Sequence, residues 1–166
     1  MSISNLEDLF LNELKDTLDA EKQILKALPK MIKAAENEDL KAGFEEHRAV
    51  TETQVERLET IFESLGKAAR GKHCPGMEGI IAEGQEIMKE LDSGPVLDAA
   101  LIAAAQKVEH YEICAYGTLA TYAEVLGYDQ AKKLLGQTLQ EEKETDEKLT
   151  TLASELNLMA EHEPAE

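Results

Sequence analysis

The chain has 166 residues, 43% of them apolar and 4% aromatic, and its 34 acidic against 17 basic side chains give a formal net charge of −17. This length suits one domain with a proper core, and a chain rich in Ala, Leu, Glu and Lys with few prolines is typical of an all-helical protein. The charge disfavours nucleic acid and anionic membrane surfaces as partners, and the longest apolar run, residues 99–105, is far too short to cross a bilayer.

The first half of the chain predicts two long helices joined by a short link. The first helix, over residues 4–35, begins with a capping sequence, SNLE, and carries a stripe that repeats in steps of three and four: Leu11, Leu14, Leu18, Glu21, Leu25, Leu28 and Ile32. The second helix is predicted over residues 38–65 and is ended by Gly66. It carries a second stripe: Phe44, His47, Thr51, Gln54, Leu58, Ile61 and Leu65. The short link predicts that the two helices are antiparallel neighbours.

The second half predicts another hairpin after an interruption. A loop with the turn signal Pro75-Gly76 leads into a shorter amphipathic helix over residues 77–91, which ends before the helix-breaking sequence DSGP. Long helices follow over residues 96–126 and 130–156, with a tight corner between them. Two antiparallel hairpins with one long connection predict an all-α, ferritin-like four-helix bundle whose crossover carries a short extra helix. We expect residues 1–158 to form this single domain and residues 159–166 to be a flexible acidic tail.

Each predicted stripe is apolar at its ends and polar in its middle. The polar positions at the common level include five carboxylates and one imidazole: Glu21, His47, Glu109, Glu112, Glu142 and Asp146. At 100° per residue, Glu109 lies at the centre of the apolar face of its helix and Glu112 at its flank. No lysine or arginine faces this level, so either the pKa values of the buried acids rise or a cation neutralises them.

A metal centre is the first explanation of these six residues. A mixed carboxylate and imidazole site suits Fe, Mn or Zn, and two divalent ions bridged by carboxylates would neutralise the acids. We therefore predict a di-metal centre, with Fe or Mn preferred to Zn, held by Glu21, His47, Glu109, Glu112, Glu142 and Asp146. The alternative is a network of protonated acids that is hydrogen-bonded to Thr51, Gln54 and Tyr116.

Three blocks of the chain resemble the bacterial YciE/YciF family. They read NLEDLFLNELKDTLDAEKQILKALPKM, DAALIAAAQKVEHYEICAYGTLATYAEVLGY and AKKLLGQTLQEEKETDEKLTTLA, and the resemblance covers residues 3–155. It implies a ferritin-like fold related to that of rubrerythrin, an association with stress responses, and a homodimer. The wider ferritin-like pattern has Glu and then Glu-x-x-His, twice. Here Thr51-x-x-Gln54 and Glu142-x-x-Thr145 depart from it, which puts oxygen activation and ferritin-like iron oxidation in doubt.

Three functions are compatible with these sequence features. The first is a cytoplasmic stress-response protein that binds one or two metal ions and serves iron- or peroxide-related redox chemistry, which would make it a di-metal oxidoreductase. The second is a non-catalytic dimeric stress protein whose degenerate metal site is empty. The third is a partner-binding module that uses its acidic exterior. Cys74 and Cys114 form no C-x-x-C motif, which fits a reducing cytoplasm, and we expect Cys74 to be exposed in its loop.

Overall fold

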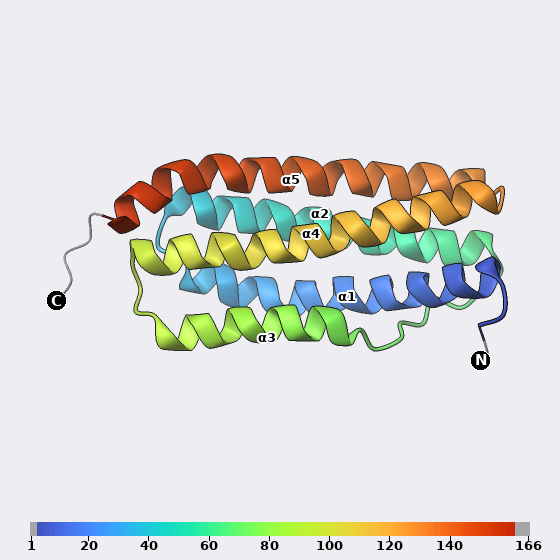
Figure 1. Cartoon of the computed structure of the whole chain (residues 1–166), viewed down its shortest axis with the longest axis horizontal. Coiled ribbons are helices and arrows are strands. Elements are labelled where there is room, and N and C mark those ends of the chain that lie inside the picture. Colours follow the sequence, from blue (N-terminus) through green and yellow to red (C-terminus); the bar gives the residue numbers. More distant parts are fainter. Residues whose placement is uncertain (1–2, 162–166) are drawn as a thin grey trace.

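The computed structural model describes residues 3–161, which fold into helices without any β-strand. The helices are α1 (Leu6–Ala34), α2 (Glu38–Ser64), α3 (Pro75–Glu90), α4 (Pro95–Val125) and α5 (Asp129–Glu161). The four long helices lie side by side, and the shorter α3 lies along the outside of this group (Figure 1). The prediction of an all-helical chain is therefore confirmed for the described residues.

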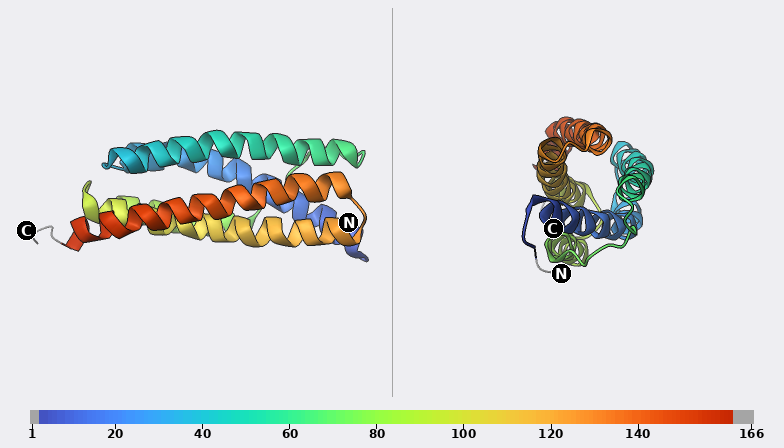
Figure 2. Two further views of the ribbon diagram at one scale, coloured as in Figure 1. Left: turned by 90° about the horizontal axis from the view of Figure 1, so that it is seen from above. Right: turned by 90° about the vertical axis from the view of Figure 1, so that its right-hand side faces the viewer.

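The four long helices form a closed ring. Helix α1 packs against α2 and α4, and α5 packs against the same two helices from the other side. Helix α3 covers the edge between α1 and α4. The end-on view in Figure 2 shows this order, and Figure 1 shows how the connection through α3 returns the chain to the end where α2 began. Side chains from all four long helices can therefore meet along one central axis.

Local signals fix the helix ends. The side chain of Asn5 accepts a hydrogen bond from the backbone N–H of Asp8, so the cap of α1 is Asn5 rather than the predicted Ser4. Gly66 and Gly127 follow α2 and α4 with φ of 64° and 73°, a left-handed conformation that favours glycine. Pro75 begins α3, two residues before the predicted start, because a proline is well tolerated in the first turn.

The start of α2 is tied to α4 by a buried acid. Asp98, only 3% exposed, accepts hydrogen bonds from the backbone N–H groups of Glu36 and Asn37, both at 2.8 Å. Asn37 in turn caps α2 by accepting from the N–H groups of residues 39 and 40. Asp98 therefore fixes the position of the link between α1 and α2 against helix α4.

The apolar core falls into two clusters with a polar layer between them. Along α1, Leu14 and Leu18 belong to one cluster and Ile24 and Leu28 to the other. Along α4, the same change occurs between Val108 and Tyr116. The buried polar residues of the intervening layer are Glu21, His47, Thr51, Gln54, Glu109, Glu112 and Glu142. The predicted polar centre of each stripe is thus buried, except that Asp146 on α5 is only half-buried.

The C-terminal helix is longer than predicted. Helix α5 continues through residues 159–161, which we expected to belong to the tail, and the remaining residues of that predicted tail lie outside the described range. Among the described residues, no helix combines the length and the apolar character that crossing a membrane requires.

Candidate metal centre

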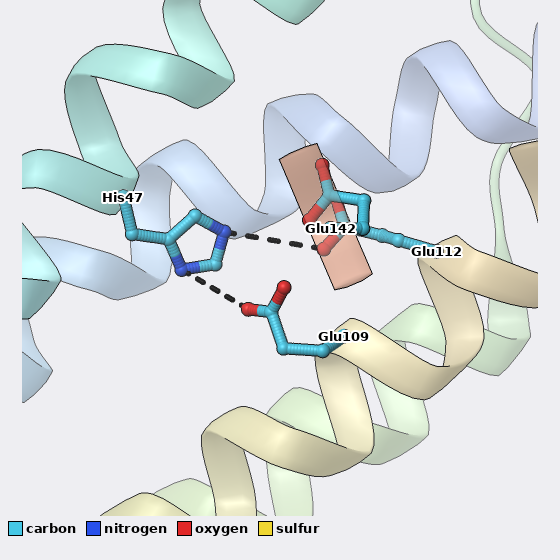
Figure 3. Close-up of side chains that lie close together, drawn as sticks. All are labelled: His47, Glu109, Glu112 and Glu142. Carbon is cyan, nitrogen blue, oxygen red and sulfur yellow. Dashed lines mark ion pairs between the residues drawn. The ribbon is translucent and has the colours of Figure 1, made fainter. Parts of the chain in front are cut away.

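Four side chains from three helices converge in the middle of the ring. His47 comes from α2, Glu109 and Glu112 from α4, and Glu142 from α5. One potential ligand atom of each lies within 4.8 Å of those of the others, and none of the four residues is more than 4% exposed. Figure 3 shows the imidazole of His47 facing the carboxylates across the centre. The group therefore offers three oxygen ligands and one nitrogen ligand in a water-poor interior.

The imidazole of His47 contacts two of the acids. Its Nδ1 lies 3.3 Å from Oε1 of Glu109, and its Nε2 lies 4.0 Å from Oε2 of Glu112 (Figure 3). Burial lowers the pKa of His47 to about 4, so the ring is neutral at neutral pH. A neutral imidazole keeps a lone pair available, and this is the form that binds metals.

The carboxyl groups strongly disfavour one another's ionisation. Burial, followed by the charges of neighbouring acids, raises the pKa of Glu109 and Glu112 well above the usual range. Burial also raises the pKa of Glu142. Arg57 relieves this repulsion only in part: its charge lowers the pKa of Glu142, but its guanidinium binds Glu141 through contacts of 2.6 and 2.7 Å. The three acids therefore need protons or a cation to remain together.

The unsatisfied atoms of the group fit a metal ion. Within residues 3–161, both carboxylate oxygens of Glu109 and of Glu112 lack a hydrogen-bond partner, and so do Oε2 of Glu142 and Nε2 of His47. Buried polar atoms are nearly always hydrogen-bonded, and leaving one unpaired costs roughly 1–3 kcal/mol or more. A divalent cation would satisfy several of these atoms at once, and three carboxylates with one imidazole suit iron, manganese or zinc.

Glu21 lies beside this group on α1. Its Oε1 accepts a hydrogen bond from the hydroxyl of Tyr116, while its Oε2 lacks a hydrogen-bond partner within the described part of the chain. Burial and the charge of Glu142 raise the pKa of Glu21 to about 8. The structure thus brings the predicted residue next to the centre, although it is not one of the four whose ligand atoms meet.

Two of the three polar residues expected around the acids do contact them. Gln54 donates to Oε1 of Glu142 and, at 3.2 Å, to Oε2 of Glu141, while Tyr116 holds Glu21. The hydroxyl of Thr51 instead donates to the backbone carbonyl of His47 at 2.8 Å. Gln54 and Tyr116 are therefore placed to orient carboxylates, whereas Thr51 is bonded within its own helix.

Asp146 is not brought into the four-residue group. Its Oδ1 accepts a hydrogen bond from Gln106 at 3.2 Å, and its Oδ2 lies 3.3 Å from Nε2 of His110, whose side chain is 69% exposed. These contacts place Asp146 at the outer edge between α4 and α5. Its charge still raises the pKa of Glu109.

The expectation that Cys74 is exposed is wrong. Its side chain is 1% exposed and caps α3 by accepting a hydrogen bond from the N–H of Met77. The thiol lies 2.9 Å from the hydroxyl of Tyr111, which donates to Asp16 at 2.7 Å. Burial raises the pKa of the thiol, which makes it a poor nucleophile. Cys114 is exposed, and the two cysteines do not pair with each other.

Comparison with known proteins assigns this chain to a family. The family model described as "Domain of unknown function (DUF892)" matches residues 5–160. "Protein YciF" from Escherichia coli (strain K12) is 52% identical over 155 residues, which cover 92% of this chain and 93% of that protein.

Two solved structures agree with this chain closely. The crystal structure of the E. coli stress protein YciF has a TM-score of 0.90 at 49% identity and covers 93% of this chain and 98% of its own. YcfI, a structural-protein candidate from Rhodopseudomonas palustris, has a TM-score of 0.89 at 47% identity, over 90% of this chain and 96% of its own. The resemblance seen in the sequence is confirmed: the chain belongs to the DUF892 family, which it shares with the bacterial stress protein YciF.

Proposed function

We propose that this protein is a ferritin-like stress-response protein that binds one or two metal ions at the centre of its helices. The observation that carries the proposal is the convergence of unpaired, buried ligand atoms from His47, Glu109, Glu112 and Glu142. The closed ring of two hairpins with a long crossover supports a ferritin-like arrangement, in which metal sites lie among facing helices.

Each residue of the centre has a separate part in this proposal. His47, Glu109, Glu112 and Glu142 would be ligands of the first ion, and Glu21 would add a carboxylate from α1 for a second. Gln54 and Tyr116 would orient Glu142 and Glu21 through their hydrogen bonds. Asp146, bonded at the edge to Gln106, would act on the centre through its charge alone. Iron or manganese bound there would supply Lewis acidity and one-electron redox exchange.

We also propose a biological role, a cellular location and an oligomeric state for the protein. The relative from E. coli is called a stress protein, and we extend that role to this chain. Two cysteines that do not pair with each other support a reducing cytoplasm. We further propose a homodimer, which light scattering of the purified protein will test, and an iron- or peroxide-related redox role.

Metal content is the direct test. The protein should be purified without chelator and analysed by mass spectrometry of its metals, beside the variants Glu109→Gln and Glu142→Gln. We expect about one or two ions per chain in the wild type and loss of metal in both variants. Glu147→Gln is the matched control, because Glu147 is exposed on the same helix as Glu142. Metal that survives in both variants would refute the assigned ligands.

A second candidate function is that of a non-catalytic stress protein whose centre is held by protons. Glu21 and Glu142 already accept hydrogen bonds from Tyr116 and Gln54, and with a pKa of about 8 Glu21 is protonated at neutral pH. This candidate predicts a metal-free protein whose melting temperature does not change when manganese or ferrous iron is added. The metal-binding protein would instead melt at a higher temperature, since a ligand that binds only the folded state stabilises it.

A further inference from the structure

An apolar cavity lies between α1, α3 and α4. Its volume is about 30 Å³, compared with the about 10–15 Å³ that one water molecule needs. The space exists because small residues occupy four of its lining positions: Ala27 on α1, Gly84 on α3, and Ala104 and Ala105 on α4. The cavity can therefore hold a molecule of two or three heavy atoms.

The walls of the cavity are almost entirely apolar. Larger side chains such as Ile24, Leu101 and Met88 complete the lining. The exposed Lys30 and the half-buried Gln85 lie toward its outer side. A cavity lined in this way offers a water molecule too few hydrogen-bond partners, so it stays dry and favours small apolar occupants.

The inner end of the cavity reaches the candidate metal centre. Among the described lining residues, His47 is the one that comes from α2, and it is 4% exposed. The same ring contacts Glu109 and Glu112, and its Nε2 has no hydrogen-bond partner within residues 3–161. An occupant of the cavity would therefore lie against the side chain of His47.

Helix α3 forms the outer wall of this cavity. It packs against α1 and α4, so it closes a space that the ring of long helices would leave open. A Cβ atom built on Gly84 would lie 3.5 Å from Cβ of Ala104, which shows that α3 and α4 approach closely at this point. Helix α3 thus encloses an apolar cavity on one side of the candidate metal centre.

We propose that the cavity between α1, α3 and α4 binds a small, uncharged, apolar molecule of the size of a diatomic gas and holds it against His47. The inference deepens the proposed function by naming the class of molecule that would lie next to the metal centre. It rests on the proposed function only in so far as a metal ion is bound there. Binding itself follows from the shape and dryness of the cavity and needs no metal.

Xenon is the probe for the test. The full chain, stripped of metal with chelator and labelled in its histidine rings, should be titrated with xenon and followed by NMR. We expect the ring signals of His47 to shift and saturate, while those of the exposed His73 and His110 stay nearly constant. Filling the cavity from either side, with Ala27→Leu or Ala105→Val, should abolish the shift of His47. Ala103→Leu is the matched control, because Ala103 is exposed on α4 and should leave the shift intact.

The outcomes separate this inference from the metal proposal. A saturable His47 shift that both filling variants remove supports the cavity site, whether or not the protein is found to bind metal. No shift in the wild type, or a shift that survives in folded Ala27→Leu and Ala105→Val proteins, overturns it even if metal is bound. Two filling variants are used because either one alone could perturb folding, and circular dichroism will show which of them is intact.

Discussion

Replacing Glu21 by glutamine should stabilise the metal-free protein at neutral pH. The side chain is fully buried, and burial together with the charge of Glu142 raises its pKa from 4.5 to about 8. Glutamine has the same shape and keeps an oxygen that can accept from Tyr116, but it cannot ionise. The change therefore removes a titration while it retains the hydrogen bond.

The size and sign of the effect follow from the two pKa values. A pKa raised on folding means that the folded chain prefers the protonated acid, so Glu21 contributes its full stability below about pH 4.5. That contribution falls as the pH rises and is lost above about pH 8. Neutral pH lies about 2.5 pH units above 4.5, and each unit is worth about 1.4 kcal/mol, so the free energy of unfolding falls by roughly 3–4 kcal/mol.

Urea denaturation with chelator present measures this difference. At about pH 5, Glu21→Gln and wild type should agree within about 1 kcal/mol, whereas near neutral pH the variant should be more stable by about 3 kcal/mol. Saturating manganese should reduce the advantage, because the wild-type carboxylate then faces a cation. A variant that is destabilised equally at both pH values would contradict the raised pKa of Glu21, as would a metal-free wild type that gains stability between about pH 5 and neutral pH.

Three further substitutions, one of them with a control at Val96, test other parts of the structure. Gln54→Leu removes the donor to Glu142 and should lower manganese affinity by about 10- to 100-fold in calorimetric titration, and an unchanged affinity would remove its orienting role. Asp98→Ala leaves two backbone N–H groups at the start of α2 without their acceptor and should cost about 2–3 kcal/mol in urea denaturation; a cost near zero would contradict this role. Phe44→Ala leaves a cavity in the core and should lower the free energy of unfolding by about 3–5 kcal/mol. Its control, Val96→Ala at an exposed position, should change that free energy by less than about 0.5 kcal/mol. Equal effects of the two substitutions would contradict the burial of Phe44.

Helix positions followed from the sequence because their signals are local. Gly66, Gly127, Pro75 and Pro95 end or begin helices through their own backbone preferences, and the predicted bounds lie within a few residues of the observed ones. The end of α5 was the exception. No glycine or proline stops that helix before residue 161, so the predicted tail boundary had only composition behind it.

Burial was harder to predict where a helix has several neighbours. The stripe on α1 included Leu25, but the structure buries Ile24 and leaves Leu25 half-buried. A stripe in steps of three and four assumes one buried face, whereas α1 packs against α2, α3 and α4. The third neighbour widens the buried arc toward Ile24, which contributes to the cavity beside α3.

In the candidate metal centre, too, helical periodicity predicted some positions, whereas others depend on how the helices pack together. Helical periodicity placed Glu109 and Glu112 on a buried face, and the structure brings both together with His47 and Glu142. Periodicity also placed Asp146 near that face, since it lies one turn after Glu142. Its position at the edge, bonded to Gln106, depends on how α5 is rotated against α4, which no single helix encodes. The contact of Cys74 with Tyr111 likewise joins segments distant in the chain.

Crystals grown or soaked with manganese, with data collected to locate its anomalous scattering, will show whether the buried carboxylates and His47 bind a metal ion. We predict a strong anomalous peak enclosed by His47, Glu109, Glu112 and Glu142, and a second peak on the side of Glu21 if two ions bind. A map with no peak among these four residues, in crystals that contain manganese bound elsewhere or none at all, would contradict it.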